Sequence, residues 1–214
     1  MSDTHRILLA PGLADPAYAV VIGQICMIWN QLEDMLGFIL TRYFSNDEQL
    51  SRAILAVSGN QSRMDLLSYL VETKERDPVF AEGMRAFIKA FNICRENRNI
   101  AVHSTLRLTA PMAPAEWMEK PSKSAINKVV KYAYAISAME QVQRDLLQTC
   151  SHGAHLISAS ILNEFYKTRP DARPKDRSDW RVPWPETPPQ PRKLNPLPPP
   201  TDKGGIPPPP SLQE

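Results

Sequence analysis

The stretch around which this chain is organised reads Arg95-Glu96-Asn97-Arg98-Asn99-Ile100-Ala101-Val102-His103. It closes a long helical pattern that begins at Asp77-Pro78, where Asp is a favoured cap and Pro a favoured first helical residue. Between Arg98-Asn99 and His103 every residue is apolar, and the pattern stops directly after the histidine. The stretch therefore predicts a helix end that carries the candidate functional residues.

Helical spacing predicts where these side chains point. Asn99 and His103 are four residues apart and share one face of the helix. Arg98 shares the apolar face, where a guanidinium is costly unless it is paired or lines a cleft. Arg98 and His103 point roughly 140° apart on an ideal helix. They can meet at one phosphate through the reach of Arg98, through a distorted last turn, or through a second copy of the motif.

The segment Arg98-Asn99-Ile100-Ala101-Val102-His103 resembles the R-N-x-x-x-H motif of HEPN domains, small all-helical proteins of prokaryotic conflict systems and RNA processing. Trp29-Asn30-Gln31-Leu32-Glu33 also resembles part of the first helix of many HEPN proteins. The resemblance covers residues 15 to 165. It implies an all-α fold, a HEPN-like helical bundle of about five helices.

The resemblance further implies a metal-independent endoribonuclease, a toxin or phage-defence effector, in which the ribose 2′-hydroxyl attacks the adjacent phosphate. His103 would be the base or acid, Arg98 the phosphate clamp and Asn99 an orienting amide, which suits histidine and a forked guanidinium chemically. It implies RNA as a partner, a homodimer that joins two motifs across one cleft, and an antitoxin or inhibitor protein. It implies neither a metal nor another cofactor.

Three further residues are candidates for binding the substrate. Arg95 and Glu96 precede the motif on the polar stripe that continues to Asn99 and His103. Glu33 flanks the apolar stripe of the first helix, where a solvated carboxylate is the simpler interpretation.

The same residues also allow interpretations without catalysis. Arginine and histidine at a helix C-terminus are stabilised by the helix dipole alone. One alternative is a non-catalytic helical module that binds RNA or protein, and another is a scaffold whose working part is the tail. Catalysis predicts that Arg98 and His103 are partly exposed in a groove between two copies. A structural role predicts Arg98 bonded to a carboxylate and His103 buried against helix-end carbonyls.

Composition sets broad limits on the function. The chain has 214 residues, 43% of them hydrophobic, and a net charge of +2. Residues 169–214 carry the whole excess, with eight Lys or Arg against six Asp or Glu, so RNA binding would need a local cluster of cations. Cys26, Cys94 and Cys150 lack CxxC spacing and indicate reduced thiols in a cytoplasmic protein. Polar residues interrupt the most apolar window, Tyr18–Leu40, so no membrane span is expected.

The chain divides by pattern into an irregular leader (1–14), a helical domain (15–167) and a proline-rich disordered tail (168–214). Helices are expected at 16–43, in a short stretch capped at Ser45, at 62–76, at 78–103, and from about 123, capped at Ser122, to 166. Gly153 is a candidate kink or break in the last helix. Residues 105–109 alternate polar and apolar side chains and are expected to be extended.

The tail holds 15 of the 21 prolines, which predicts polyproline-II stretches within disorder. Pro188–Lys193 fits a PxxPx[KR] ligand, although a plain solubilising tail is the favoured interpretation. Trp180 and Trp184 are the residues that would dock back on the helices or bind a partner.

Other motifs are weaker or absent from the sequence. His152 and His155 have a spacing that suits a metal on one helix face, but no carboxylate lies near, and ordinary helix-surface histidines are the simpler interpretation. The sequence contains no GxxxxGK[ST], GxGxxG or GxSxG, so nucleotide hydrolysis, dinucleotide binding and an α/β-hydrolase triad lack their usual loops.

Overall fold

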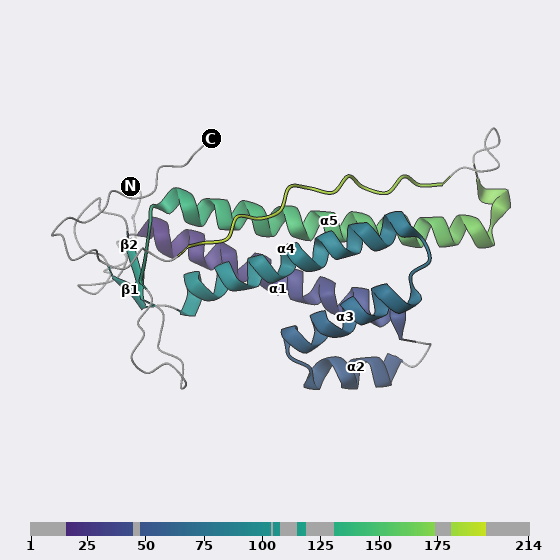
Figure 1. Ribbon diagram of the computed structural model, residues 1–214, viewed down its shortest axis with the longest axis horizontal. Coiled ribbons are helices and arrows are strands. Elements are labelled where there is room, and N and C mark those ends of the chain that lie inside the picture. Colours follow the sequence, from purple (N-terminus) through teal and green to yellow (C-terminus); the bar gives the residue numbers. More distant parts are fainter. Residues whose placement is uncertain are drawn as a thin grey trace, which may run out of the picture. The chain divides into compact units, whose positions relative to one another are not determined.

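The computed structural model describes residues 16–44, 48–103, 105–107, 115–118, 131–173 and 181–195. Within these ranges five α-helices make up most of the chain, so the fold is of the predicted all-α class, with three short strands beside the helices (Figure 1). They are α1 (Pro16–Tyr43), α2 (Glu48–Val57), α3 (Asn60–Lys74), α4 (Pro78–His103) and α5 (Ile136–Thr168). The remaining elements are β1 (Thr105–Arg107), β2 (Ala115–Met118), β3 (Lys131–Tyr134) and the 3-10 helix η1 (Pro170–Ala172). The predicted leader and the caps at Ser45 and Ser122 lie outside the described residues.

Helix α4, which carries the motif, has the predicted ends. Its first residue is Pro78, and Asp77 Oδ1 accepts hydrogen bonds from the backbone N–H groups of Val79 (2.9 Å) and Phe80 (3.1 Å). These bonds confirm Asp77 as the N-cap, because they satisfy two N–H groups that have no partner inside the helix. The helix then runs to His103, so the motif occupies its last turns.

The chain forms two compact units. We call Met27–Arg95 with Arg144–Arg192 the helical unit, and Met1–Cys26, Glu96–Gln143 and Lys193–Glu214, as far as they are described, the sheet unit. Arg98, Asn99 and His103 thus belong to the sheet unit.

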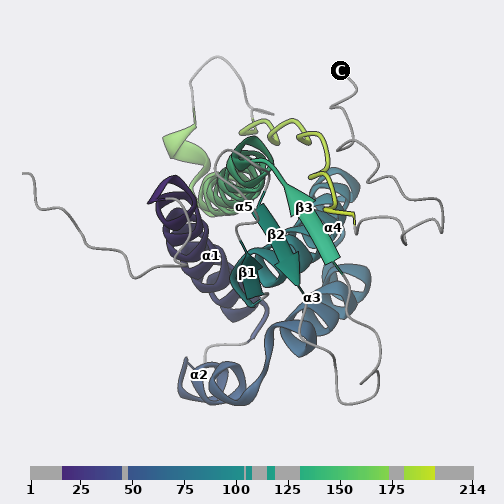
Figure 2. The ribbon, with the colours of Figure 1, turned by 90° about the vertical axis from the view of Figure 1, so that its left-hand side faces the viewer.

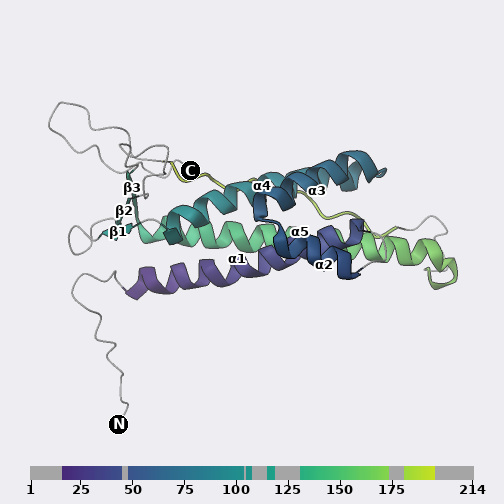
Figure 3. The same cartoon turned by 90° about the horizontal axis from the view of Figure 1, so that it is seen from below.

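The core of the helical unit forms where α1, α3, α4 and α5 bury their apolar faces (Figures 1 and 3). Trp29 of α1 lies against Phe91 of α4, with ring centroids 5.0 Å apart, and both side chains are buried. Removing large apolar side chains of this kind from water stabilises a fold by about 1.5–3 kcal/mol each. The aromatic contacts therefore fix α1 against α4 in this unit.

Gly153 lies at a close approach of α5 to its neighbours, and the prediction that it splits the helix in two is wrong, whereas a kink there stays a prediction. Helix α5 is one element from Ile136 to Thr168. A Cβ at Gly153 would lie 2.6 Å from Met35 Sδ and 2.7 Å from Phe87 Cε2. The position needs glycine because two neighbouring side chains occupy the space that a Cβ would fill. A protein interior is packed as closely as a crystal of small organic molecules, so it leaves no room for an extra methyl group.

The sheet unit contains a three-stranded antiparallel sheet in the order β1-β2-β3 (Figure 2). Thr105 pairs with Met118, and Ala115 pairs with Tyr134. The expected extended stretch after His103 is confirmed for β1. The predicted helix start near residue 123 is wrong, because residues 131–134 form β3 and α5 begins at Ile136. Helical spacing in a short apolar run does not exclude a strand, and here β2 supplies the backbone partner.

Residues 181–195 correct the prediction that the whole tail is disordered. They are extended and belong to no helix or strand (yellow in Figure 1). Residues 181–192 contact other residues of the helical unit, and residues 193–195 contact other residues of the sheet unit. Trp184 docks back on the helices, which was one of the two roles predicted for it, and Leu194 is buried at 9% exposure. Specific side chains on the helices bind this segment, which composition alone does not reveal. Trp180 and residues 196–214 lie outside the described residues.

The three cysteines are free thiols; Cys94 is buried, and Cys26 and Cys150 are half-buried. None of the helices in the described part of the chain combines the length and apolar character needed to cross a bilayer.

Candidate functional site

The last turns of α4 bring the three motif residues together within one chain. The Nη1 atom of Arg98 lies 2.6 Å from Nε2 of His103 and donates to Oδ1 of Asn99 at 3.3 Å. Of the arrangements that the spacing left open, the structure adopts the first, in which the long Arg98 side chain reaches His103. A second copy of the chain is not needed to pair Arg98 with His103.

The contact between Arg98 and His103 has one possible direction as a hydrogen bond. A guanidinium has only donors, so Arg98 Nη1 donates and His103 Nε2 accepts with its lone pair. His103 and Asn99 are exposed and Arg98 is half-buried, so a solvent-borne ligand has access to the group. The exposure of His103 differs from what a purely structural role predicts.

Glu96, a predicted substrate-binding residue, lies in the same unit but already has a partner. Its Oε2 is 2.5 Å from Nζ of Lys193, in the extended segment of the tail. Because Lys193 neutralises the Glu96 carboxylate, this pair would repel an anionic substrate near Arg98 less than an unpaired carboxylate would.

Asn97 is a residue beside the motif that the sequence analysis did not single out. It is fully buried, and its Oδ1 accepts a hydrogen bond from the backbone N–H of Leu194 at 2.9 Å. The sequence does carry a signal for the burial of Asn97. This residue lies three residues after Cys94 and four before Ala101, so it shares a helix face with two residues that are buried. A polar amide at such a position predicts a buried hydrogen-bond partner.

Arg95 and Glu33, the other two predicted substrate-binding residues, belong to the helical unit. Both bind the first turn of α3: Arg95 Nη1 donates to Gln61 Oε1, and Glu33 Oε1 accepts from Asn60 Nδ2. These hydrogen bonds explain Arg95 and Glu33 as contacts that hold α3 in place. A role in substrate binding stays a prediction.

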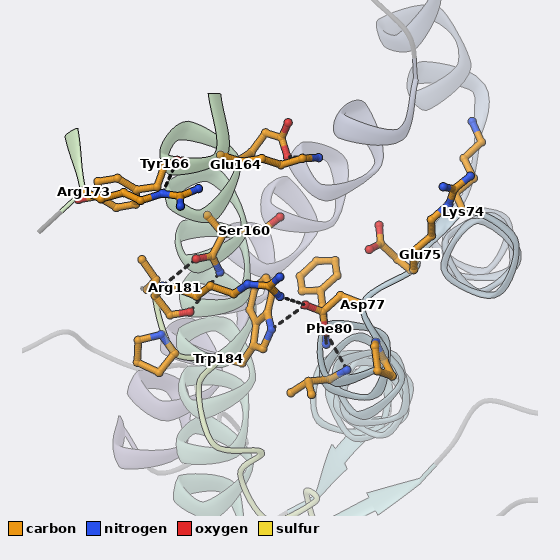
Figure 4. A pocket seen from close by; sticks show the side chains of 17 residues that line it. Lys74, Glu75, Asp77, Phe80, Ser160, Glu164, Tyr166, Arg173, Arg181 and Trp184 are labelled. Carbon is orange, nitrogen blue, oxygen red and sulfur yellow. Dashed lines mark hydrogen bonds and ion pairs between the residues drawn. The ribbon is translucent and has the colours of Figure 1, made fainter. Parts of the chain in front are cut away.

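A cleft of about 990 Å³ opens in the helical unit where α3 ends, α4 begins and the extended segment crosses α5 (Figure 4). Asp77 is one of the residues that line this cleft: Oδ1 caps α4, and Oδ2 accepts a hydrogen bond from the indole N–H of Trp184 at 3.1 Å. The Trp184 ring lies on Phe80, with centroids 4.9 Å apart. Arg181 Nη1 is 4.0 Å from the same carboxylate. No motif in the sequence pointed to this cleft.

The two histidines of α5 differ in environment, which corrects the interpretation of both as surface residues. His152 is buried, and its Nε2 lies 3.4 Å from the carbonyl oxygen of Gly83; His155 is exposed. Burial lowers the pKa of His152, the Gly83 carbonyl raises it in part, and His155 lowers it further. Among the described residues no cluster of three or more His, Cys, Asp or Glu could hold a metal ion.

Cys94 lies four residues before Arg98 on the same helix, and its burial makes the thiol unreactive. Burial raises the pKa of its thiol to about 12, and Sγ lies 3.5 Å from Thr149 Oγ1. Because the thiolate is the reactive form, this cysteine is a packing residue.

The likeness to HEPN domains thus rests on the spacing of Arg98, Asn99 and His103 and on their position at the end of α4. The chain matches no family model, no curated protein and no solved structure in the comparisons made with each.

Proposed function

We propose that the protein is a metal-independent endoribonuclease of the HEPN type, acting as a toxin or phage-defence effector. The observation that carries this proposal is the contact of Arg98 Nη1 with His103 Nε2 at 2.6 Å, beside Asn99, on an exposed helix end. It unites a proton acceptor and a phosphate-binding cation, the two groups that cleavage of RNA through its own 2′-hydroxyl requires.

In this proposal His103 Nε2 takes the proton from the ribose 2′-hydroxyl. The 2′ oxygen then forms a bond to phosphorus, the bond from phosphorus to the 5′ oxygen breaks, and the leaving oxygen takes a proton from water. The products are a 2′,3′-cyclic phosphate and a 5′-hydroxyl end. Arg98 binds the non-bridging phosphate oxygens as their charge grows, and Asn99 Oδ1 orients the guanidinium.

The contact seen here corresponds to a resting arrangement, because Arg98 occupies the lone pair that His103 needs as a base. An arriving phosphate, which binds a guanidinium more strongly than a neutral imidazole does, would draw Arg98 away and free Nε2. A homodimer would supply a second motif to one cleft, and an antitoxin or inhibitor would act by covering it.

The test is cleavage of RNA by the purified protein, with and without EDTA, beside His103→Ala and Arg98→Ala. We expect cleavage that survives EDTA, 2′,3′-cyclic phosphate ends, and a loss of about 10²–10⁴-fold in each variant. His155→Ala and Arg169→Ala are matched controls at exposed positions and should retain full activity. Cleavage that persists in both motif variants would refute the assignment.

The second candidate is a non-catalytic module for binding RNA or protein. The docking of residues 181–194 on helices α4 and α5 favours it, because this chain already binds an extended peptide through specific side chains. Wild-type protein that binds RNA, leaves it intact, and loses binding in Arg98→Ala would support this candidate over the nuclease.

A further inference from the structure

In the helical unit, residues 181–192 lie on α4 and α5 as an extended strap, and we use that name for them below (Figure 1). Five of its residues are prolines: Pro183, Pro185, Pro188, Pro189 and Pro191. Proline restricts the backbone to extended conformations and has no N–H to leave unsatisfied. The strap therefore loses little conformational entropy when it binds, as is usual for proline-rich ligands.

The first contact is made with the backbone of the strap. The Asn163 side chain of α5 accepts from the Val182 N–H at 2.7 Å and donates to the Val182 carbonyl at 3.1 Å. One amide thus pairs with both polar groups of a single residue. Such a pair sets the position and direction of an extended peptide.

The second contact binds the tryptophan side chain of the strap. Trp184 rests its ring on Phe80 and donates its indole N–H to Asp77 Oδ2 at 3.1 Å (Figure 4). Oδ1 of the same carboxylate caps α4, so its position is set by the helix and does not depend on the strap. Phe80 is likewise a residue of the first turn of α4. The tryptophan site is therefore preformed, which reduces the entropic cost of binding.

The third contact lies further along the same two helices. The Gln190 side chain donates to the carbonyl of Ala86 at 3.4 Å, and the Arg192 N–H donates to Oδ2 of the buried Asp145 at 3.3 Å. In order, the strap meets α4 at residues 77, 80 and 86, and α5 at 163 and then 145. It therefore runs parallel to α4 and antiparallel to α5.

We propose that this α4–α5 surface is a peptide-binding site and that the strap is its tethered ligand. The partner that fits is a protein presenting an extended segment in which an aliphatic residue, proline, tryptophan and proline follow one another. Every group that recognises the strap in these contacts belongs to α4, α5 or the Asp77 cap. A separate peptide with the same order of residues would therefore make the same contacts, and it would compete with the strap.

Tethering explains how such a site stays closed until a partner arrives. A short linker gives an attached ligand an effective concentration on the order of millimolar. A free peptide of equal affinity must exceed that concentration to displace it. Weakening the strap in its own chain should therefore open the site to an added peptide, whereas weakening the helix side should not.

The experiment measures binding of a fluorescein-labelled peptide of residues 181–192 to the full chain by anisotropy. The strap is weakened by Trp184→Ala with Val182→Pro, which remove the indole and the Val182 N–H and leave the helices unchanged. We expect this double variant to bind the peptide at least about tenfold more tightly than the wild-type chain. Adding Asn163→Ala to it should reverse the gain, and a peptide with alanine for tryptophan should fail to bind.

Circular dichroism of each variant checks that the helices are folded. If Trp184→Ala with Val182→Pro unfolds, Trp184→Phe with Val182→Pro replaces it as the milder pair. A folded double variant that binds no added peptide would overturn the proposal, since the strap would then be only a structural element. A dimer formed by exchange of straps between two copies would overturn the assignment of a partner protein as the occupant. None of these outcomes depends on ribonuclease activity.

Discussion

At the scale of single residues, side-chain length and burial decide what the motif region does. Arg98 meets His103 despite their angular separation on the helix, because its guanidinium ends a long flexible stem. Asn97, the preceding residue, is buried, and its side chain accepts a hydrogen bond from the N–H of Leu194. Neighbouring residues of one stretch thus serve a candidate site and a structural anchor.

The buried His152 makes stability depend on pH. Burial, as the largest cause, lowers its pKa below the usual 6.5, so the folded protein keeps it neutral while the unfolded chain takes up a proton. Its contribution to stability is complete above the unfolded pKa and is lost as pH falls through the lower folded pKa. We expect the free energy of unfolding, measured with urea, to fall between about pH 7 and pH 5.

His152→Gln keeps a donor for the Gly83 carbonyl and removes the titration. Its unfolding free energy should vary less over the same pH range than that of the wild type. His155→Gln, at an exposed position of the same helix, should retain most of the wild-type slope. Equal slopes in wild type and His152→Gln would show that other groups cause the acid sensitivity.

At the scale of elements, α4 and α5 are defined by different kinds of information. The Asp77 cap and the apolar spacing along α4 are local signals, and both of its ends agree with prediction. The start of α5 is set by β3, whose partner β2 lies 13 or more residues earlier in the chain. Hydrogen bonds between distant segments override helical spacing in residues 131–134.

The close packing around Gly153 is measurable by a pair of matched substitutions. Gly153→Ala adds a methyl group 2.6 Å from Met35 Sδ and 2.7 Å from the Phe87 ring, and should destabilise the fold by about 1–3 kcal/mol. Gly23→Ala, in α1 with nothing within 4 Å of the added carbon, should stabilise by up to about 1 kcal/mol through helix propensity. Urea unfolding of both variants tests the pair; a neutral Gly153→Ala would mean that α5 shifts at little cost.

At the scale of the whole molecule, the described part of the tail belongs to the fold. The strap binds in the helical unit, and Lys193, Leu194 and Asn195 bind in the sheet unit, where Asn195 accepts from the Tyr134 hydroxyl. The tail therefore adds buried contacts to each unit.

Leu194→Pro tests how much stability this anchoring contributes. It removes both the leucine side chain and the N–H that Asn97 binds, whereas Leu194→Ala removes only the side chain. We expect the proline variant to be less stable than the alanine variant by about 1–3 kcal/mol in urea unfolding, the cost of a buried polar group without its partner. Thr187→Pro, at an exposed position of the strap, should change stability by less than about 0.5 kcal/mol. Equal stabilities of the two Leu194 variants would show that water replaces the lost N–H.

The sequence by itself determined the all-α class, the ends of α1 and α4, and the candidate trio at the end of α4. Caps, proline positions and helical spacing act over a few residues, so they can be recognised in the sequence without knowledge of the tertiary structure. Only the tertiary structure decided that Arg98 reaches His103, that β3 replaces a helical start, that Gly153 is a packing contact, that His152 is buried, and that residues 181–194 bind the helices. Each of these depends on which distant residues become neighbours, and that follows from packing and not from local propensity.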